Sequence, residues 1–266
     1  MPEILEVELY RAFAEKALGR RIAKAWVVDS RYGRGGTTPG RLRAALVGHL
    51  FTAARRRGKL LLLDMGGDLT VGLRFGMTGG LVVDGSEALD RLRYGPGVFH
   101  DKWVRVRITF EDGGQLLLHD PRRFGSIELA PDEDRLGPDA LTVSARDLRV
   151  ALATAPGRAA ATVAPLKARL MDQERVAGVG NLLADEILWR ADLAPGRRTP
   201  LDEEEFRRLY KELQATLRQL GRRGGSHMGD LMAERHDGAR CPRDGTELVR
   251  EVVGGRTTYW CPLHQH

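Results

Sequence analysis

The alternation of apolar and polar side chains predicts strands in the first half of the chain. Residues 104–110, VRVRITF, alternate with a period of two, which is typical of a half-buried antiparallel strand. Apolar runs separated by glycine-rich turns predict further strands at 60–64, 69–75 and 115–119. We therefore expect residues 20–130 to form a β-sandwich with one interposed helix.

A helical pattern replaces this alternation from about residue 135. Ser144 is a candidate N-cap for a helix over SARDLRVALATA, and APLKARLMDQ predicts a short apolar helix. A longer amphipathic helix beginning near Pro200 is indicated by apolar residues at helical spacing. These residues are Phe206, Leu209, Leu213, Leu217 and Leu220. The chain then ends in a hairpin-like tail.

Together these patterns predict an α+β fold in three parts. Residues 1–132 form an N-terminal β-sandwich with a flanking N-terminal helix, residues 133–234 a helical domain, and residues 235–266 a terminal β-hairpin finger.

The opening MPEILEVELYR places Pro2 and Glu3 directly after the initiator. Proline is favoured at the first position of a helix, and a carboxylate in the first turn suits the positive end of the helix dipole. Apolar side chains recur every four residues up to Gly19, so residues 2–18 predict an amphipathic helix. If Met1 is trimmed, however, Pro2 carries a secondary amine that can act as a nucleophile. The pattern alone leaves both interpretations open.

The balance of charge favours an anionic partner. Lys and Arg outnumber Asp and Glu by 42 to 36 among 266 residues, and the pI is near 9.6. The basic side chains gather in clusters, which favours nucleic acid. The clusters are Arg55–Lys59, Arg122–Arg123, Arg197–Arg198 and Arg222–Arg223. Because we find no bilayer-length apolar run, no leader and only two cysteines, we expect a soluble cytoplasmic protein without a disulfide framework or a membrane partner.

Residues 170–195, LMDQERVAGVGNLLADEILWRADLAP, place a glycine-rich turn between two predicted helices. Backbone N–H groups at a helix start can bind a phosphate without reading base sequence. An ordinary helical hairpin with a tight turn explains the same pattern.

This segment resembles the helix-two-turn-helix signature of the formamidopyrimidine-DNA glycosylase and endonuclease VIII family of base-excision repair enzymes. Other family motifs follow in the family's order. They are PEILEVE at the start, RRGKLLLL at 56–63, FGMTG at 75–79, DPRRFG at 120–125 and GRTTYWC at 255–261. The resemblance covers essentially the whole chain. Several motifs in the family's order identify the family more specifically than any single motif does.

The resemblance implies that Pro2 attacks the anomeric carbon of a damaged nucleoside. A secondary amine on C1′ yields an iminium cation, the electron sink that acidifies C2′ and allows the 3′ phosphate to be eliminated. Glu3 is implied as the proton donor and acceptor. Lys59 resembles the family's strand lysine near the lesion, although a solvated lysine in a basic run is the simpler interpretation.

Enzymes of this kind rotate the target nucleotide out of the stack and fill the gap. Met77 and Phe124 match the family's apolar wedges and Arg122 the arginine that faces the orphaned base; core packing is the alternative for the first two. Asn181 and Arg256 match residues that clamp phosphates around the lesion. The full set implied to bind DNA is Met77, Arg122, Arg123, Phe124, Asn181 and Arg256.

The terminal finger departs from the family in two residue types. It keeps the C-x2-C-x16-C-x2-C spacing but fills it with Cys241, Asp244, Cys261 and His264. Because all four can bind zinc, we expect one structural zinc ion. The alternative is a metal-free hairpin in which Asp244 makes a turn, and His236 and His266 are spare candidate ligands.

Two other departures concern the active site. Leu5 replaces the usual second proline, while Pro2, Glu3 and Glu6 remain. Fourteen residues separate Ser226 from Cys241, fewer than in the 8-oxoguanine branch of the family. The segment looks more like that of the branch acting on oxidised pyrimidines or other open lesions, which puts 8-oxoguanine in doubt as the main substrate.

We therefore predict a bifunctional DNA glycosylase and AP lyase. It would act as a monomer on double-stranded DNA containing damaged bases or abasic sites, and nick the strand by β- or β,δ-elimination. One alternative is a relative that binds damaged DNA without cutting it. Another is a zinc-ribbon adaptor, which leaves Pro2, Glu3 and DPRRFG unexplained.

Overall fold

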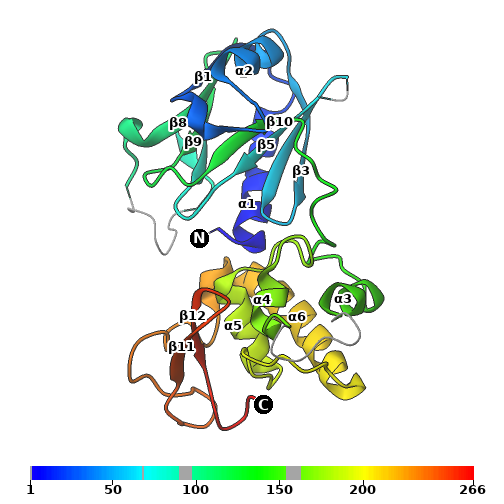
Figure 1. Cartoon of the computed structure of the whole chain (residues 1–266). Helices are drawn as coiled ribbons and strands as arrows, with labels where there is room; N and C mark the ends of the chain where they lie inside the picture. The colour runs from blue at the N-terminus through cyan, green and yellow to red at the C-terminus, as the bar shows by residue number, and fades with distance from the viewer. Residues whose placement is uncertain (1, 68, 90–97, 154–162) are drawn as a thin grey trace. The chain divides into compact units, whose positions relative to one another are not determined.

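The computed structural model describes residues 2–67, 69–89, 98–153 and 163–266, and these fall into two compact units (Figure 1). The first unit comprises Pro2 and Glu6–Glu133, and the second comprises Glu3–Leu5 and Asp134–His266. Each unit has its own apolar core.

The described residues of the first unit contain two five-stranded sheets, which confirms the predicted sandwich strands. One sheet has the order β1 (Ile22–Val27), β8 (Val104–Phe110), β9 (Gln115–His119), β6 (Gly80–Val83) and β7 (Ser86–Glu87). The other has the order β2 (Gly33–Arg34), β10 (Ser126–Leu129), β5 (Thr70–Arg74), β4 (Leu60–Met65) and β3 (Phe51–Arg57). All pairs are antiparallel except β10 with β2.

Strand β8 differs from the expected alternation at one position. The alternation predicts that Val104 and Val106 are buried and that Arg105 between them is exposed, but Arg105 is buried as well. Its guanidinium donates from Nε to the carbonyl oxygen of Asp120 at 2.7 Å and from Nη1 to that of Lys102 at 3.1 Å. Hydrogen bonds to backbone carbonyls therefore make burial of this charge tolerable.

The helices around the sheets are α1 (Ile4–Ala14), α2 (Pro39–Leu46) and three short 3-10 helices, η1 (Glu15–Ala17), η2 (Ser30–Tyr32) and η3 (Asp101–Trp103). The prediction that residues 2–18 form one helix is wrong at both ends. Helix α1 begins at Ile4, which leaves Pro2 and Glu3 outside it, and ends at Ala14, where η1 follows. Gly19, with φ +73°, ends the segment as expected.

The second unit is built from α3 (Ala145–Leu152), α4 (Leu166–Met171), α5 (Asn181–Arg190), α6 (Glu203–Arg223) and η5 (Ser226–Met228), followed by the hairpin strands β11 (Val249–Val253) and β12 (Arg256–Trp260). Ser144 caps α3 as predicted, with its hydroxyl accepting from Asp147 N at 3.1 Å. The five apolar residues predicted for the long helix are all buried in α6. That helix begins at Glu203, because Asp202 and Glu205 form a capping box there.

Candidate active site and nucleic-acid interface

The carboxylate of Glu3 caps helix α5. It accepts backbone N–H groups from Gly180 at 2.7 Å, Leu182 at 2.9 Å and Leu183 at 3.3 Å, and the side chain is 1% exposed. Gly180, the N-cap residue, offers no side-chain cap of its own. Glu3 thus supplies the negative group that the first turn of a helix favours.

Gly180 has to be glycine for this contact to form. A Cβ built at Gly180 would lie 2.3 Å from Cδ of Glu3 and 2.5 Å from each carboxylate oxygen. The glycine-rich turn therefore brings the backbone against an internal carboxylate. Of the two interpretations left open for this turn, phosphate binding does not apply to the N–H groups of Gly180, Leu182 and Leu183, because all three donate to Glu3.

Gln173 holds the same turn from the other side, and sequence reasoning did not single it out. Its Nε2 donates to the carbonyl oxygens of Met171 and Val179, at 2.7 and 2.9 Å, and its Oε1 accepts from Gly178 N at 2.9 Å. Gly178 has φ +114° and its carbonyl accepts from Ile4 N at 3.1 Å. One amide side chain thereby fixes the loop that receives Glu3.

Asn181 and Arg256 lie on two neighbouring elements of the second unit. Asn181 opens α5, and its Nδ2 donates to the carbonyl oxygen of Thr257 in β12 at 3.1 Å. Its Oδ1 is buried without a partner among the described residues. Arg256 is exposed at the start of β12, after a turn formed by two glycines. The structure thus brings Asn181 of α5 against Thr257 of the hairpin, the residue that follows Arg256.

A buried charge network that sequence reasoning missed supports this junction. Lys167 Nζ lies 2.7 Å from Asp185 Oδ1 and donates to Thr258 Oγ1 at 2.6 Å, with the Lys167 side chain fully buried. Arg235 forms a second ion pair with Asp185. Burial lowers the pKa of Lys167, and the Asp185 carboxylate opposes that shift. The available sequence signal is that α4 and α5 carry charged residues between apolar ones, which does not by itself single out Lys167 and Asp185.

In the first unit, buried Asp120 ties the FGMTG loop to the DPRRFG loop. Its carboxylate accepts from Thr78 Oγ1 at 2.9 Å, from Gly125 N at 2.7 Å and from the Tyr32 hydroxyl at 3.3 Å. The two loops approach so closely that a Cβ on Gly76 would lie 2.4 Å from the backbone carbon of Phe124. Met77 and Phe124 are therefore carried by loops with a fixed mutual position.

The tips of these loops differ in what they expose. Phe124 is 53% exposed, and the guanidinium carbon of Arg122 lies 4.9 Å from the centre of its ring. Met77 is half-buried. Arg123, with φ +58°, forms an ion pair with Asp29. An exposed phenylalanine beside an arginine is available to contact a base, whereas Arg123 already has an internal partner.

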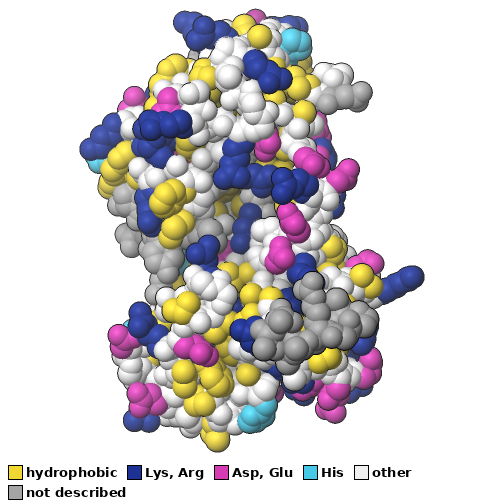
Figure 2. Space-filling model, in the orientation of Figure 1, with side chains coloured by type: hydrophobic (Ala, Val, Ile, Leu, Met, Phe, Trp, Pro, Cys, Tyr) yellow, Lys and Arg dark blue, Asp and Glu magenta, His cyan; other side chains and the backbone are white. Residues whose placement is uncertain are grey.

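The basic clusters are largely paired within the protein. Arg55 lies 2.5 Å from Asp64 and 3.0 Å from Glu133, and Arg56 lies 2.9 Å from Glu8. On the face drawn in Figure 2, several dark blue side chains likewise lie next to magenta ones. Lys59 is half-buried in the turn between β3 and β4. Clusters counted along the sequence thus overstate the charge available to DNA.

The four finger residues converge as their spacing predicted. Cys241, Asp244, Cys261 and His264 each offer a ligand atom, and these atoms lie within 4.8 Å of one another. His264 Nδ1 lies 2.6 Å from Asp244 Oδ2, and Cys261 Sγ lies 3.3 Å from the same oxygen. Hydrogen bonds from Thr246 N and His264 lower the pKa of Asp244, against the effect of desolvation. Two sulfurs, one oxygen and one nitrogen at this spacing fit a tetrahedral metal site with ligand distances of roughly 2.0–2.3 Å. The spare histidines, His236 and His266, lie outside the group.

Within the described residues, no helix combines the length and apolar character needed to cross a membrane.

Comparison with known proteins agrees with these features. The model described as the formamidopyrimidine-DNA glycosylase N-terminal domain matches residues 1–127, and that described as the formamidopyrimidine-DNA glycosylase H2TH domain matches residues 136–230. The fold is thus that of a two-domain protein with a helix-two-turn-helix (H2TH) segment. The chain belongs to the formamidopyrimidine-DNA glycosylase family.

Similar proteins cover the chain from end to end. The formamidopyrimidine-DNA glycosylase of Thermus thermophilus is 34% identical, over 100% of this chain and 98% of its own. That of Cereibacter sphaeroides is 32% identical over 100% of both chains. Among solved structures, Lactococcus lactis Fpg in complex with abasic-site-containing DNA is 26% identical, with a TM-score of 0.80 over 100% of both chains. The complex of the same protein with Fapy-dG-containing DNA also has a TM-score of 0.80 at 26% identity, over 99% of this chain and 100% of the other.

Proposed function

We propose that this protein is a bifunctional DNA glycosylase and AP lyase of base excision repair, with double-stranded DNA as its partner. The observation that carries the proposal is the placement of Glu3, next to Pro2 in sequence, as a buried carboxylate fixed by three backbone N–H groups at the start of α5. Family membership and the names of the relatives support the same activity.

The chemistry begins at Pro2. After removal of Met1, the lone pair of the secondary amine attacks C1′, and the bond from C1′ to the damaged base breaks with its electrons leaving on the base. The amine then loses its proton, and its lone pair breaks the C1′–O4′ bond while Glu3 protonates the departing ring oxygen, so the sugar opens and an iminium ion forms. This iminium ion withdraws electrons from C2′, so loss of a C2′ proton expels the 3′ phosphate as the C3′–O bond breaks. Water then hydrolyses the iminium ion and returns the free amine.

Glu3 serves this sequence as the proton donor and acceptor. Its carboxylate is held at a fixed position by the α5 amides, so little reorganisation is needed when it transfers a proton. We assign Lys59 the contact with the phosphate or lesion near Pro2, by analogy with the family.

The remaining residues hold the DNA. Asn181 and Arg256 lie at the junction of α5 with the hairpin and bind phosphates flanking the lesion. The exposed ring of Phe124 enters the stack with Met77, and Arg122 faces the unpaired base. Arg123 keeps its ion pair with Asp29 and positions the loop that carries Arg122 and Phe124.

We also propose that the four converging finger residues hold one zinc ion and that residues 235–266 form a finger within the second unit. Bound zinc would fix the ends of the β11–β12 hairpin, which carries Arg256. Cys241 and Cys261 supply the thiolates, and Asp244 and His264 replace the usual second and fourth cysteine.

The segment before the finger bears on the damaged base. The main chain of Asp230 and Leu231 donates to the buried carboxylate of Glu186 at 3.0 Å each, and Arg235 pairs with Asp185. Because this short segment is held to α5 at these three residues, we propose that it does not fold over the flipped base and that ring-opened or oxidised bases other than 8-oxoguanine are preferred. Excision from matched duplexes carrying Fapy-dG, 8-oxoguanine or an oxidised pyrimidine tests this; fastest release of 8-oxoguanine would refute it.

Borohydride trapping on duplex DNA with an abasic site tests the central step. The wild-type protein should form a covalent adduct after reduction of the iminium ion. Pro2→Gly and a variant that retains Met1 should form far less while still binding the duplex. A wild-type protein with a processed terminus that binds this DNA yet never crosslinks would support the non-cleaving alternative instead.

A further inference from the structure

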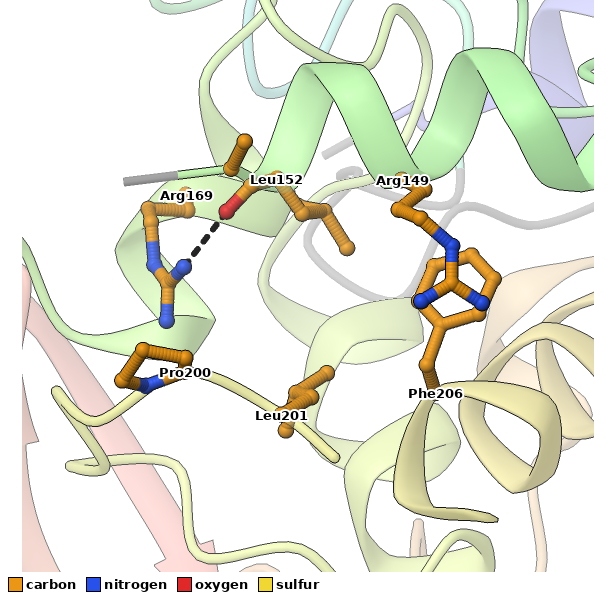
Figure 3. Close-up of a pocket in the computed structure, with 7 residues that line it drawn as sticks. Arg149, Leu152, Arg169, Pro200, Leu201 and Phe206 are labelled. Carbon is orange, nitrogen blue, oxygen red and sulfur yellow. Dashed lines mark hydrogen bonds between the residues drawn. The ribbon is translucent and has the colours of Figure 1, made fainter. Parts of the chain in front are cut away.

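A pocket in the second unit is lined by side chains that the proposed repair chemistry does not use. It has a volume of about 380 Å³ and lies between α3, α4 and the start of α6 (Figure 3). Its apolar walls come from Leu152, Ala153, Pro200, Leu201 and Phe206. Arg149 and Arg169 are its two cationic residues.

Arg169 is buried with most of its hydrogen-bonding capacity unused. The side chain is 3% exposed, and its Nη1 donates to the carbonyl oxygen of Leu152 at 2.5 Å. Nε and Nη2 are buried without an acceptor among the described residues. A guanidinium carries five N–H donors and keeps its charge at physiological pH. Unpaired donors on a buried cation are costly, so this side chain favours an acceptor in the pocket.

The charge of Arg169 is not balanced by a carboxylate of the described chain, since its hydrogen bond there is to the α3 carbonyl. Burial lowers the pKa of Arg169, and repulsion from Arg175 and Arg197 adds to that effect. Residues 154–162, TAPGRAAAT, which follow Ala153 in the sequence, include no Asp or Glu. A negative charge for Arg169 is therefore best supplied by a ligand.

Arg149 forms the outer part of the site. Its guanidinium lies over the Phe206 ring (Figure 3), with the guanidinium carbon 3.9 Å from the ring centre. Its Nη2 lies 2.9 Å from Glu203. The side chains of Arg149 and Glu203 are 47% and 81% exposed. Because an exposed ion pair of this kind is weak, Arg149 can turn to a ligand at low cost.

We propose that this pocket binds a monocarboxylate with an apolar body, its carboxylate on Arg169 and its apolar part against Leu201 and Phe206. The planar guanidinium matches the two oxygens of a carboxylate. A phosphate is a poorer fit, because its further charged oxygens would face apolar walls. The volume lies in the range of small-ligand sites. Either a free organic acid or the C-terminal residue of a peptide has this chemistry, and neither depends on the glycosylase activity.

Calorimetric titration of the full chain with 4-methylpentanoate tests the proposal. We expect one site per chain. Arg169→Met should weaken binding by about tenfold or more, because it removes the charge-assisted hydrogen bonds. Arg149→Met should weaken it by a smaller factor. Arg146→Met, on the exposed surface of the same helix α3, is the matched control and should leave the affinity unchanged.

Two further arms identify the source of the carboxylate. Acetyl-Gly-Gly-Leu with a free C-terminus should bind, and its C-terminal amide should not. A peptide that binds more tightly than 4-methylpentanoate assigns the site to a protein C-terminus, and the reverse order assigns it to a free acid. Inorganic phosphate should bind more weakly than either.

The proposal is overturned if neither 4-methylpentanoate nor the free peptide binds, or if Arg169→Met binds both as tightly as the wild type. It is also overturned if the peptide amide or inorganic phosphate binds with the same affinity as the free acid. Thermal unfolding covers the case in which Arg169→Met does not fold. In that case 4-methylpentanoate should raise the melting temperature of the wild type and of Arg146→Met, and raise that of Arg149→Met less. Equal shifts in all three proteins would contradict the assignment.

Discussion

At the scale of single residues, Glu3 has a structural role beside the chemical role proposed for it. Both carboxylate oxygens accept backbone N–H groups, Oε2 from Gly180 and Leu183 and Oε1 from Leu182. A neutral carboxamide has the same shape but only one acceptor atom. Substitution of Glu3 therefore affects the start of α5 as well as any proton transfer.

Glu3→Gln should lower the free energy of unfolding of the second unit by about 1–3 kcal/mol, because the new NH2 group faces a backbone donor. It should also abolish base excision. Denaturant unfolding followed by circular dichroism measures the first effect, and release of a damaged base from duplex DNA measures the second.

Two glycine variants make this test specific. Gly180→Ala places its methyl group against the Glu3 carboxylate and should destabilise the protein and slow excision. Gly196→Ala adds a methyl group where no atom lies within 4 Å and should do neither. If Glu204→Gln, an exposed change, cost as much stability as Glu3→Gln, the capping argument would fail.

His119 provides a pH-dependent contribution to stability. Its ring stacks on Phe99 with centroids 5.0 Å apart and meets the Trp103 ring at 5.5 Å. Burial lowers the pKa of His119; nearby Asp120 opposes this shift, while Arg105 and His100 add to it. The folded state therefore binds its proton less readily than the unfolded state, whose pKa is about 6.5.

Stability should accordingly fall as pH drops below about 6.5, because the unfolded state takes up the proton first. His119→Phe should flatten the decline in melting temperature between roughly pH 7 and 5. His49→Gln, an exposed change, should leave the decline as it is. An identical pH profile for His119→Phe and the wild type would exclude His119 as its source.

At the scale of elements, local rules predicted the helix and strand positions well and the long-range contacts poorly. The Ser144 cap and the apolar face of α6 follow from spacing within one segment. The start of α1 at Ile4 does not, because Glu3 is drawn to amides far along the chain. Burial of Arg105 and of the Lys167–Asp185 pair likewise depends on partners that periodicity along one element cannot reveal.

The β11–β12 hairpin should depend on metal. Strand β11 leaves Arg250, Glu251 and Val252 exposed, so this strand buries little apolar surface. In small modules the free energy of metal binding contributes directly to folding. Purified protein should contain about one zinc ion per chain, as a single tetrahedral site requires. Metal analysis by plasma mass spectrometry checks this.

Asp244→Ala should lose much of the zinc and weaken DNA binding, because the hairpin presents Arg256. Asp237→Ala, 81% exposed in the same finger, is the control and should keep both. Asp244→Cys should retain zinc. Active protein that contains none would favour the metal-free hairpin.

At the scale of the whole molecule, net charge is a poor guide to the DNA-binding surface. The excess of six positive charges is small, and arginines such as Arg55 and Arg56 are engaged with carboxylates. The family motifs found Arg122 and Arg256, which the structure leaves exposed. Charge counts along the sequence could not distinguish Arg122 and Arg256 from the arginines that pair with carboxylates, because those ion pairs depend on the tertiary fold.

Arg256→Ala should weaken binding to an abasic duplex and reduce the slope of log affinity against log salt by about one, as expected for the loss of one phosphate contact. Arg55→Ala should leave the slope unchanged, because its charge is already paired with Asp64 and Glu133. Fluorescence anisotropy across a salt series measures both slopes. Equal changes in the two variants would argue against this distinction.

The bonds between Glu3 and α5 join residues 177 to 180 positions apart in the chain. At a synthesis rate of about 5–20 residues per second, Gly180, Leu182 and Leu183 are made roughly 10–35 s after Glu3. Pro2 emerges from the ribosome long before that. A nascent chain therefore carries the amine proposed as the nucleophile before the Glu3 carboxylate is held in place, and on this proposal the two can act together only once α5 has been made and folded.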